Sequence, residues 1–188
     1  MTAAIDPDQV QSELHRFPEA TSLPLVVYHA VFVATGQGAG EAAAESYEAL
    51  FARNGWGGAW RDGIYRYHHF HATQHEVLGI ARVQASVRFN GEDGPLVDVR
   101  AGDVVVIPAG VSHCSEDASD DLMVVGAYPD SGIVDIQRGT PGRKPDMRAK
   151  IGKVALPPAD PVFGRQGPLT RYWSQRITSP ARDAPGPD

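Results

Sequence analysis

The sequence has a single cysteine, Cys114, among its 188 residues. No disulfide can form within the chain, so nothing in it indicates an oxidising compartment. The sequence also has no apolar run near the roughly 20 residues of a membrane span, and residues 1–19 lack the basic and apolar regions of a secretory signal. We therefore expect a cytoplasmic protein with no membrane partner.

Basic residues are also scarce: 17 Lys and Arg stand against 23 Asp and Glu, a net charge of −6. This balance argues against nucleic acid as a main partner, because phosphate contacts need a basic surface. The charge is uneven, since the chain from Arg138 onward carries ten Lys or Arg and only four Asp or Glu. Charge runs are usually solvated faces, so we expect this basic part to lie across its own acidic domain or a neighbour's. Binding of a polyanion is the less favoured interpretation.

The length suits one domain that buries a core without disulfide staples. Composition divides the chain into four parts. We predict a mobile segment at 1–20, a β-barrel at 21–139, a loop-rich extension at 140–178 that packs on the barrel, and a disordered tail at 179–188.

Local patterns predict one helix and many short strands. Residues 25–33 are apolar and β-branched, which indicates a strand buried on both faces. Apolar residues at helical spacing within 41–53, followed by Asn54 and Gly55, predict a helix at about 41–54. Gly57 and Gly58 are then expected to break the chain.

The region from Trp60 to Tyr128 alternates β-rich runs with Gly-, Pro- and Asn-containing turns. No long helical pattern separates the runs, which favours an all-β sandwich or barrel over a parallel α/β sheet. The runs are 64–71, 76–89, 97–99, 104–107 and 122–128.

Histidines are concentrated just before the second of these runs. Side chains alternate along a strand, so His69 and His71 share a face while His68 points the other way. Glu76 follows a short stretch that can turn the chain, and His113 comes 37 positions later, beyond a Pro-Ala-Gly turn. Adjacent strands lie about 5 Å apart, so a barrel can bring the four groups together. Three imidazoles and one carboxylate suit one divalent Fe, Mn, Co, Ni, Cu or Zn ion, and do not suit Ca or Mg.

Two spaced motifs carry these residues. The stretch Gly63-x5-His69-x-His71-x4-Glu76 resembles the first motif of the cupin superfamily. The stretch Gly102-x5-Pro108-x-Gly110-x2-His113 resembles the second. Two multi-point motifs in the right order are far more specific than a lone HxH.

The resemblance implies a fold and a ligand set. The fold is the cupin double-stranded β-helix, an RmlC-like jelly-roll barrel, here with one N-terminal helix and an irregular C-terminal extension. The implied ligands are His69, His71, Glu76 and His113. The wider texture is similar to single-domain bacterial cupins of unassigned activity, and the resemblance also implies a homodimer formed through the sheets.

The sequence departs from the cupin motifs at two positions. Val83 stands where the first motif has a glycine, and Asp117 stands where the second has an asparagine. Both positions lie in structural turns of that family, so the departures concern local backbone shape and leave the ligand set intact.

Several neighbours of the ligands are candidates for other roles. Tyr65 and Tyr67 share the parity of His69 and His71, so both are candidate catalytic residues that line the pocket, or else barrel packing. Arg82 shares the parity of Glu76 if no bulge intervenes, and an inward arginine would suit an anionic substrate.

Two further residues next to ligands are expected to point away from the ion. His75 should hydrogen-bond near the site rather than replace His69 as a ligand. Cys114 is expected to be an inert buried thiol.

Three histidines and a glutamate fill four positions of an octahedron and leave two for water, dioxygen or substrate. We therefore expect a metal-dependent enzyme acting on a small organic substrate, with dioxygenase-like oxidoreductase chemistry first and isomerase or lyase chemistry on a sugar- or keto acid-like substrate second. A non-catalytic module that binds a small molecule or metal is the alternative. A purely structural barrel is disfavoured, because buried ionisable groups are costly.

Overall fold

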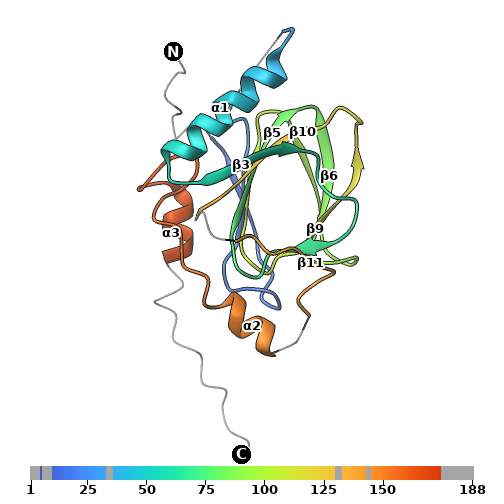
Figure 1. Cartoon of the computed structure of the whole chain (residues 1–188), viewed down its shortest axis with the longest axis vertical. Helices are drawn as coiled ribbons and strands as arrows, with labels where there is room; N and C mark the ends of the chain where they lie inside the picture. Colours follow the sequence, from blue (N-terminus) through green and yellow to red (C-terminus); the bar gives the residue numbers. More distant parts are fainter. Residues whose placement is uncertain (1–4, 6–9, 33–35, 130–132, 143–144, 175–188) are drawn as a thin grey trace, which may run out of the picture.

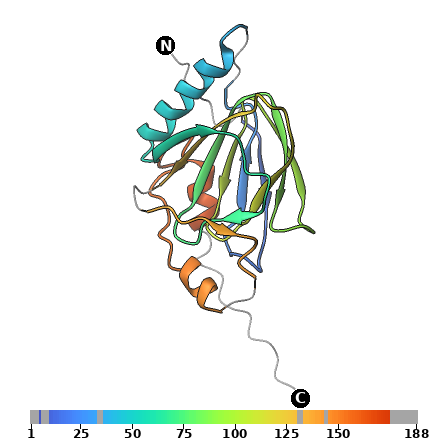
Figure 2. The ribbon, with the colours of Figure 1, turned by 45° about the vertical axis from the view of Figure 1, so that its right-hand side comes forward.

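The computed structural model describes residues 5, 10–32, 36–129, 133–142 and 145–174. They form two antiparallel sheets that face each other around a common interior (Figures 1 and 2). The first sheet has the order β1 (Ser12–His15), β2 (Leu25–Tyr28), β8 (Val104–Ile107), β5 (Glu76–Arg82), β10 (Met123–Tyr128), β3 (Gly57–Asp62). The second has the order β11 (Gln137–Arg138), β4 (His69–Phe70), β9 (His113–Ala118), β6 (Gln84–Phe89), β7 (Leu96–Arg100).

The strand order confirms the predicted all-β cupin barrel. Sequential strands cross from one sheet to the other: β4, β6, β7 and β9 belong to the five-stranded sheet, and β5, β8 and β10 to the six-stranded sheet. Such alternation between two sheets is the double-stranded β-helix of a jelly roll. It brings the strands of the two sequence motifs to one end of the barrel.

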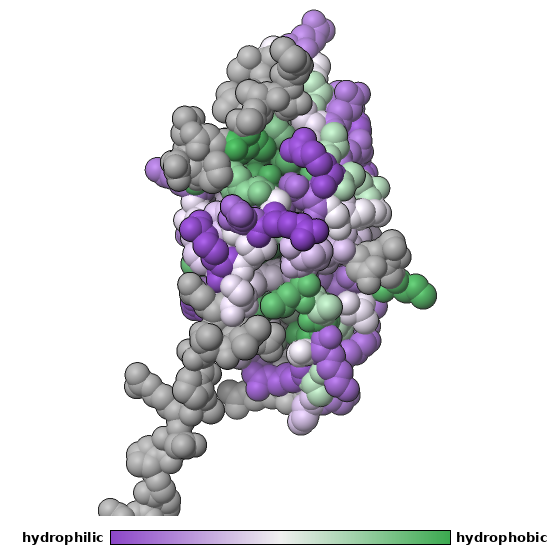
Figure 3. All heavy atoms as spheres, turned by 90° about the vertical axis from the view of Figure 1, so that its left-hand side faces the viewer, coloured by the Kyte–Doolittle hydropathy of each residue, from purple (hydrophilic) through white to green (hydrophobic). Residues whose placement is uncertain are grey.

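The four inner strands of the six-stranded sheet are buried on both faces, whereas its edge strands β1 and β3 are largely exposed. Its inner face packs against the second sheet through a cluster that includes Leu78, Ile80 and Val105. Its outer face is covered by α1 (Ala39–Arg53) and α3 (Pro168–Ser174), and Tyr47 and Trp173 belong to a second apolar cluster on that face. This explains the continuous apolar sequence of β2 and β8. Figure 3 shows the side that carries the helices, where hydrophilic side chains separate smaller hydrophobic patches.

Two predicted strands are shorter than expected because the backbone turns within them. The run 25–33 ends as a strand at Tyr28, because Ala30 adopts φ 55° and its N–H donates to Asp103 Oδ1 at 3.0 Å. The run 76–89 divides into β5 and β6 at Val83, which has φ 57°. This left-handed conformation is one that a branched side chain rarely adopts, so the position favours the glycine that the cupin motif has there.

Other elements also differ from expectation. The helix runs from Ala39 to Arg53, so it begins two residues and ends one residue earlier than the predicted 41–54. Gly57 and Gly58 begin strand β3 instead of breaking the chain. Only His69–Phe70 of the run 64–71 is a strand.

Both ends of the chain add structure to the barrel. Residues 12–15, within the segment predicted to be mobile, form β1 and pair with β2. The extension contains α2 (Pro145–Ile151) as well as α3, where only irregular structure was expected. Trp173 Nε1 donates to the carbonyl of Pro24 at 2.9 Å, so the extension packs on its own barrel. The predicted tail, 179–188, lies outside the described residues.

Basic side chains from Arg138 onward contact the same chain, as expected if this basic part lies across its own domain. Arg148 donates to the carbonyl of Glu19 at 2.6 Å, and the Arg138 guanidinium lies 4.1 Å from the centre of the Tyr67 ring. None of the helices in the described part of the chain is long and apolar enough to span a bilayer.

Candidate metal centre

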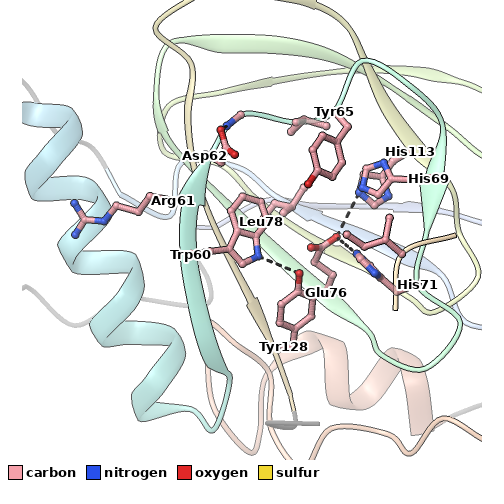
Figure 4. Close-up of a pocket in the computed structure, with 13 residues that line it drawn as sticks. Trp60, Arg61, Asp62, Tyr65, His69, His71, Glu76, Leu78, His113 and Tyr128 are labelled. Carbon is pink, nitrogen blue, oxygen red and sulfur yellow. Dashed lines mark hydrogen bonds and ion pairs between the residues drawn. The ribbon is translucent and has the colours of Figure 1, made fainter. Parts of the chain in front are cut away.

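The four implied ligands lie together at one end of the barrel interior (Figure 4). His69 on β4 pairs directly with His113 on β9, and their ring centres are 4.1 Å apart. Glu76 begins β5 on the facing sheet. Its Oε2 atom is 3.3 Å from His71 Nε2 and 3.3 Å from His113 Nε2. The barrel therefore brings residues from three strands and one loop to a common point.

Each of the three histidines turns its Nδ1 toward a main-chain carbonyl. The acceptors are Tyr67 O at 3.3 Å for His69, Val111 O at 3.4 Å for His113 and Asp135 O at 2.5 Å for His71. A carbonyl accepts only from N–H, so this arrangement favours the tautomer that carries its proton on Nδ1. The Nε2 lone pair is then free to bind an ion.

The burial and the orphaned atoms of this donor set are compatible with a metal ligand set. The four side chains are at most 5% exposed, and neither His71 Nε2 nor Glu76 Oε2 makes a hydrogen bond of good geometry within the described structure. Two ligand atoms that each lie about 2.1 Å from one ion are roughly 3.0 to 3.4 Å apart. The two 3.3 Å separations fall in this range.

The donors are not yet in the closer arrangement of a formed site. Across the described ranges, no group of three or more His, Cys, Asp or Glu side chains is placed so that it could hold an ion without movement. The residues thus suit an ion in type, and binding requires their side chains to move closer together.

The electrostatics favour the protonation state that a ligand needs at Glu76 and His69, but not at His71. Burial raises the pKa of Glu76, but the close His113 and His71 rings outweigh it and hold that pKa well below its usual range. Burial, together with the nearby His113, lowers the pKa of His69 to about 4. Burial also lowers the pKa of His71, but Glu76 and the Asp135 carbonyl raise it by more. At neutral pH the carboxylate is ionised and His69 is neutral.

A cavity of about 280 Å³ opens in front of these groups. Tyr65 and Tyr128 both line it, and their rings reach into it in Figure 4. Trp60 Nε1 donates to the Tyr128 hydroxyl at 3.0 Å. Gly126 makes this possible, since a Cβ there would lie 2.1 Å from the Trp60 ring. The other lining residues are Arg61, Asp62, Gly63, Ile64, Leu78 and Ile136.

Sequence reasoning missed the Trp60 and Tyr128 pair. Burial, and then the charge of Glu76, raise the pKa of Tyr128, so its phenol stays protonated beside the carboxylate. Neither residue belongs to the two motifs. The signal in the sequence was the position of Tyr128 in the alternation along its strand. That alternation does not say which face lines the cavity until the neighbouring strands are known.

The predicted catalytic residues have different outcomes. Tyr65 lines the cavity, as expected. Tyr67 does not: its ring stacks on the Tyr65 ring at 4.9 Å, and the Arg138 guanidinium covers it.

The prediction that Arg82 points inward is wrong. Its Nε donates to the carbonyl of Asp121 at 2.8 Å, and its stem packs against Gly40 of α1. The register between β5 and β10 shifts between Met123 and Val124, which leaves Ala81 as an extra residue in β5. A bulge of this kind reverses the facing of every later side chain.

The remaining candidates point away from the centre. His75 Nδ1 accepts from the N–H of Ala109 at 2.9 Å, so this histidine holds the turn of the second motif instead of an ion. Cys114 Sγ lies 3.5 Å from His68 Nε2, and burial raises the pKa of the thiol. A protonated, buried thiol is consistent with the expected inert residue.

The strand order gives the protein the cupin fold, and the clustered donors give it a candidate metal centre. No family model matches the sequence. The uncharacterized protein YjlB of Bacillus subtilis is 37% identical over 158 residues, which cover 84% of this chain and 90% of that protein. The chain therefore belongs to the same family as YjlB.

Solved structures resemble the chain only distantly. Acireductone dioxygenase from Bacillus anthracis, with a cadmium ion in its active centre, is 17% identical at a TM-score of 0.36, over 69% of this chain and 84% of that one. Oxalate decarboxylase from Lactobacillus farciminis is 14% identical at a TM-score of 0.34, over 69% of this chain and 31% of that one. The strand order described above, not these scores, carries the fold assignment.

Proposed function

We propose that the protein is a metal-dependent enzyme that acts on a small organic substrate, with dioxygenase-like oxidoreductase chemistry favoured. The observation that carries the proposal is the convergence of three imidazoles and one carboxylate at the inner end of a cavity. Such a cavity can hold a small molecule next to an ion bound by His69, His71, Glu76 and His113.

Each part of the site has a distinct task in this proposal. An ion held there supplies a Lewis acid and, if redox-active, a means of using dioxygen. Tyr65 and Tyr128 offer hydroxyl groups to the substrate, and the Trp60 contact fixes the position of the Tyr128 hydroxyl. Leu78 and Ile136 supply apolar walls that limit water beside the reacting groups.

The cavity also limits the charge of the substrate. Arg61 lines it, but its guanidinium binds Glu41 and Glu48 of α1 at 2.9 and 2.7 Å and points away in Figure 4. Arg82 faces the helix. With both arginines engaged elsewhere, the ion is the main positive charge for a substrate, which favours a neutral compound or one with a single anionic group.

A second candidate is isomerase or lyase chemistry. The buried Glu76 carboxylate lies near the protonated phenol of Tyr128, and such a pair is suited to moving a proton on a bound substrate. A non-catalytic module that binds a metal or metabolite would use the same donors without turnover.

Metal analysis of protein purified without a nickel column tests the proposal. We expect about one equivalent of a transition metal by mass spectrometry, and its loss in His113→Ala. The matched control is His68→Ala, because His68 sits beside His69 in sequence but turns its Nε2 toward Cys114. Stoichiometric Fe or Mn with oxygen uptake supports the oxygenase, and Zn or Ni without oxygen chemistry supports the isomerase or lyase. Absence of any bound metal, even after incubation with each ion, contradicts the proposal.

The homodimer and the cytoplasmic location stay predictions. Size-exclusion chromatography with light scattering tests the first, and cell fractionation tests the second.

A further inference from the structure

His71 differs from the other two histidines in the source of its Nδ1 partner. His69 and His113 face the carbonyl of the residue two positions earlier in their own segment. His71 instead faces the carbonyl of Asp135, 64 positions later, at 2.5 Å. The orientation of His71 therefore depends on where a distant segment of the chain lies.

The side chain of Asp135 holds that segment in place. Its Oδ1 accepts from the N–H of Ala72 at 2.9 Å, the N–H of Thr73 at 3.0 Å and the Thr73 hydroxyl at 2.6 Å. These two residues lie in the turn between His71 and Glu76. Asp135 thus contacts the His71 ring through its main-chain carbonyl. Its carboxylate accepts hydrogen bonds from the turn that follows His71.

Contacts on the other side of Asp135 tie it to the C-terminal extension. Gln137 Nε2 donates to Oδ2 at 3.1 Å, and Lys150 Nζ of α2 lies 3.7 Å from the same oxygen. Strand β11 also pairs with β4, where Arg138 is opposite His69. Burial raises the pKa of Asp135, but the hydrogen bonds from Thr73, Gln137 and Ala72 lower it by more, so the carboxylate stays ionised.

We propose that Asp135 is a positioning residue for the candidate metal centre. It keeps the His71 proton on Nδ1 and aims the Nε2 lone pair at the point shared with Glu76 and His113. The inference rests on the ligand set of the proposed function, and it adds a residue outside both motifs. Outer groups that orient a ligating histidine commonly change metal affinity by about 10- to 100-fold when removed.

Two measurements on Asp135→Ala test the proposal. The first is the zinc dissociation constant by competition with a chromophoric chelator, for which we expect a 10- to 100-fold increase. The second is long-range ¹H–¹⁵N NMR of metal-free, histidine-labelled protein at a pH where the rings are neutral. Wild type is expected to show protonated Nδ1 at His69, His71 and His113, and Asp135→Ala is expected to shift only His71 toward the Nε2–H tautomer.

Two further variants are expected to have a smaller effect and no effect, respectively. Asp135→Asn keeps an acceptor oxygen for the turn and loses the charge, so we expect a few-fold weaker zinc binding and a smaller shift at His71. Lys150→Ala removes only the exposed ion pair and should match wild type. If Asp135→Ala does not fold, Asp135→Asn carries the test by the same NMR signals.

The outcomes separate this inference from the proposed function. If wild type binds no zinc, the proposed function fails, while the NMR tautomers still report on Asp135. If wild type binds zinc but the variants leave both affinity and the His71 signals unchanged, the role of Asp135 is overturned and the metal centre stands. Equal changes at all three histidines also overturn it, because they indicate general loosening.

Discussion

Two positions on one face of strand β5 show how a single strand serves two purposes. Glu76 at its start faces His71 and His113, while Ile80, four residues later, is fully buried among apolar side chains of both sheets. Leu78 lies between them and belongs to both regions, since it lines the cavity and joins the apolar cluster. The tightly packed Ile80 end keeps the strand rigid. The Glu76 end can therefore hold buried ionisable groups beside a cavity.

The largest effect is expected at the packed end of this comparison. Ile80→Ala leaves a void that closely packed neighbours cannot fill, so we expect a loss of about 4 kcal/mol in the free energy of unfolding. Urea denaturation followed by circular dichroism measures it. Ile80→Val serves as the control and should cost about 1 kcal/mol. Equal, small losses in both variants would show that this end is not tightly packed.

Added metal should stabilise the protein only by binding at the Glu76 end of β5. An ion that binds the folded state alone stabilises it by about 2.7 kcal/mol when its free concentration is 100 times the dissociation constant. Differential scanning fluorimetry of metal-free protein with added zinc should show a rise in Tm. The rise should persist in Ile80→Val and vanish in His113→Ala. A rise of the same size in His113→Ala would place the binding site elsewhere.

Truncation of Leu78, which lies between Glu76 and Ile80, should have an intermediate effect on the free energy of unfolding. Leu78→Ala enlarges an existing cavity that solvent reaches, so we expect a loss of about 2 kcal/mol, at the low end for this substitution. The same variant should keep its zinc affinity, because Leu78 is not among the donors. Unfolding experiments and chelator competition on one preparation test both statements, and a loss as large as that of Ile80→Ala would contradict the difference between the two positions.

The smallest effect is the pH dependence contributed by His69 in metal-free protein. Its pKa in the folded protein is about 4, below the ordinary 6.5, so the unfolded chain takes up the proton first as pH falls. Stability should therefore decrease as pH falls from 6.5 toward 4. We expect this contribution to be on the order of 1 kcal/mol.

Comparison of wild type with His69→Asn isolates this contribution. Unfolding free energies measured in chelator between pH 7 and pH 4 should fall less steeply in the variant. His71, whose pKa is raised, acts in the opposite sense, since its contribution is present below pH 6.5 and is lost as pH rises through the raised pKa. Parallel curves for wild type and His69→Asn would refute the low pKa of His69.

Much of the fold was predictable because its signals are local. The helix at 39–53, strand β8 and the doubly buried β2 follow from apolar spacing and turn residues. Strand β9 was not predicted, because after its histidine it reads as polar and acidic, and residues 116–118 are partly or fully exposed. Helices α2 and α3 were missed because each is only seven residues long and lies in a proline-rich region.

The sequence by itself indicated the candidate donor set, because the residue types and spacing of the two motifs are recorded along the chain. The tertiary structure decided the rest. A bulge turned Arg82 away from the cavity, Trp60 and Tyr128 met across two strands, and Asp135 came to face His71 from 64 positions along the chain. Register, bulges and the path of a distant segment depend on how the whole chain packs, and no local pattern records them.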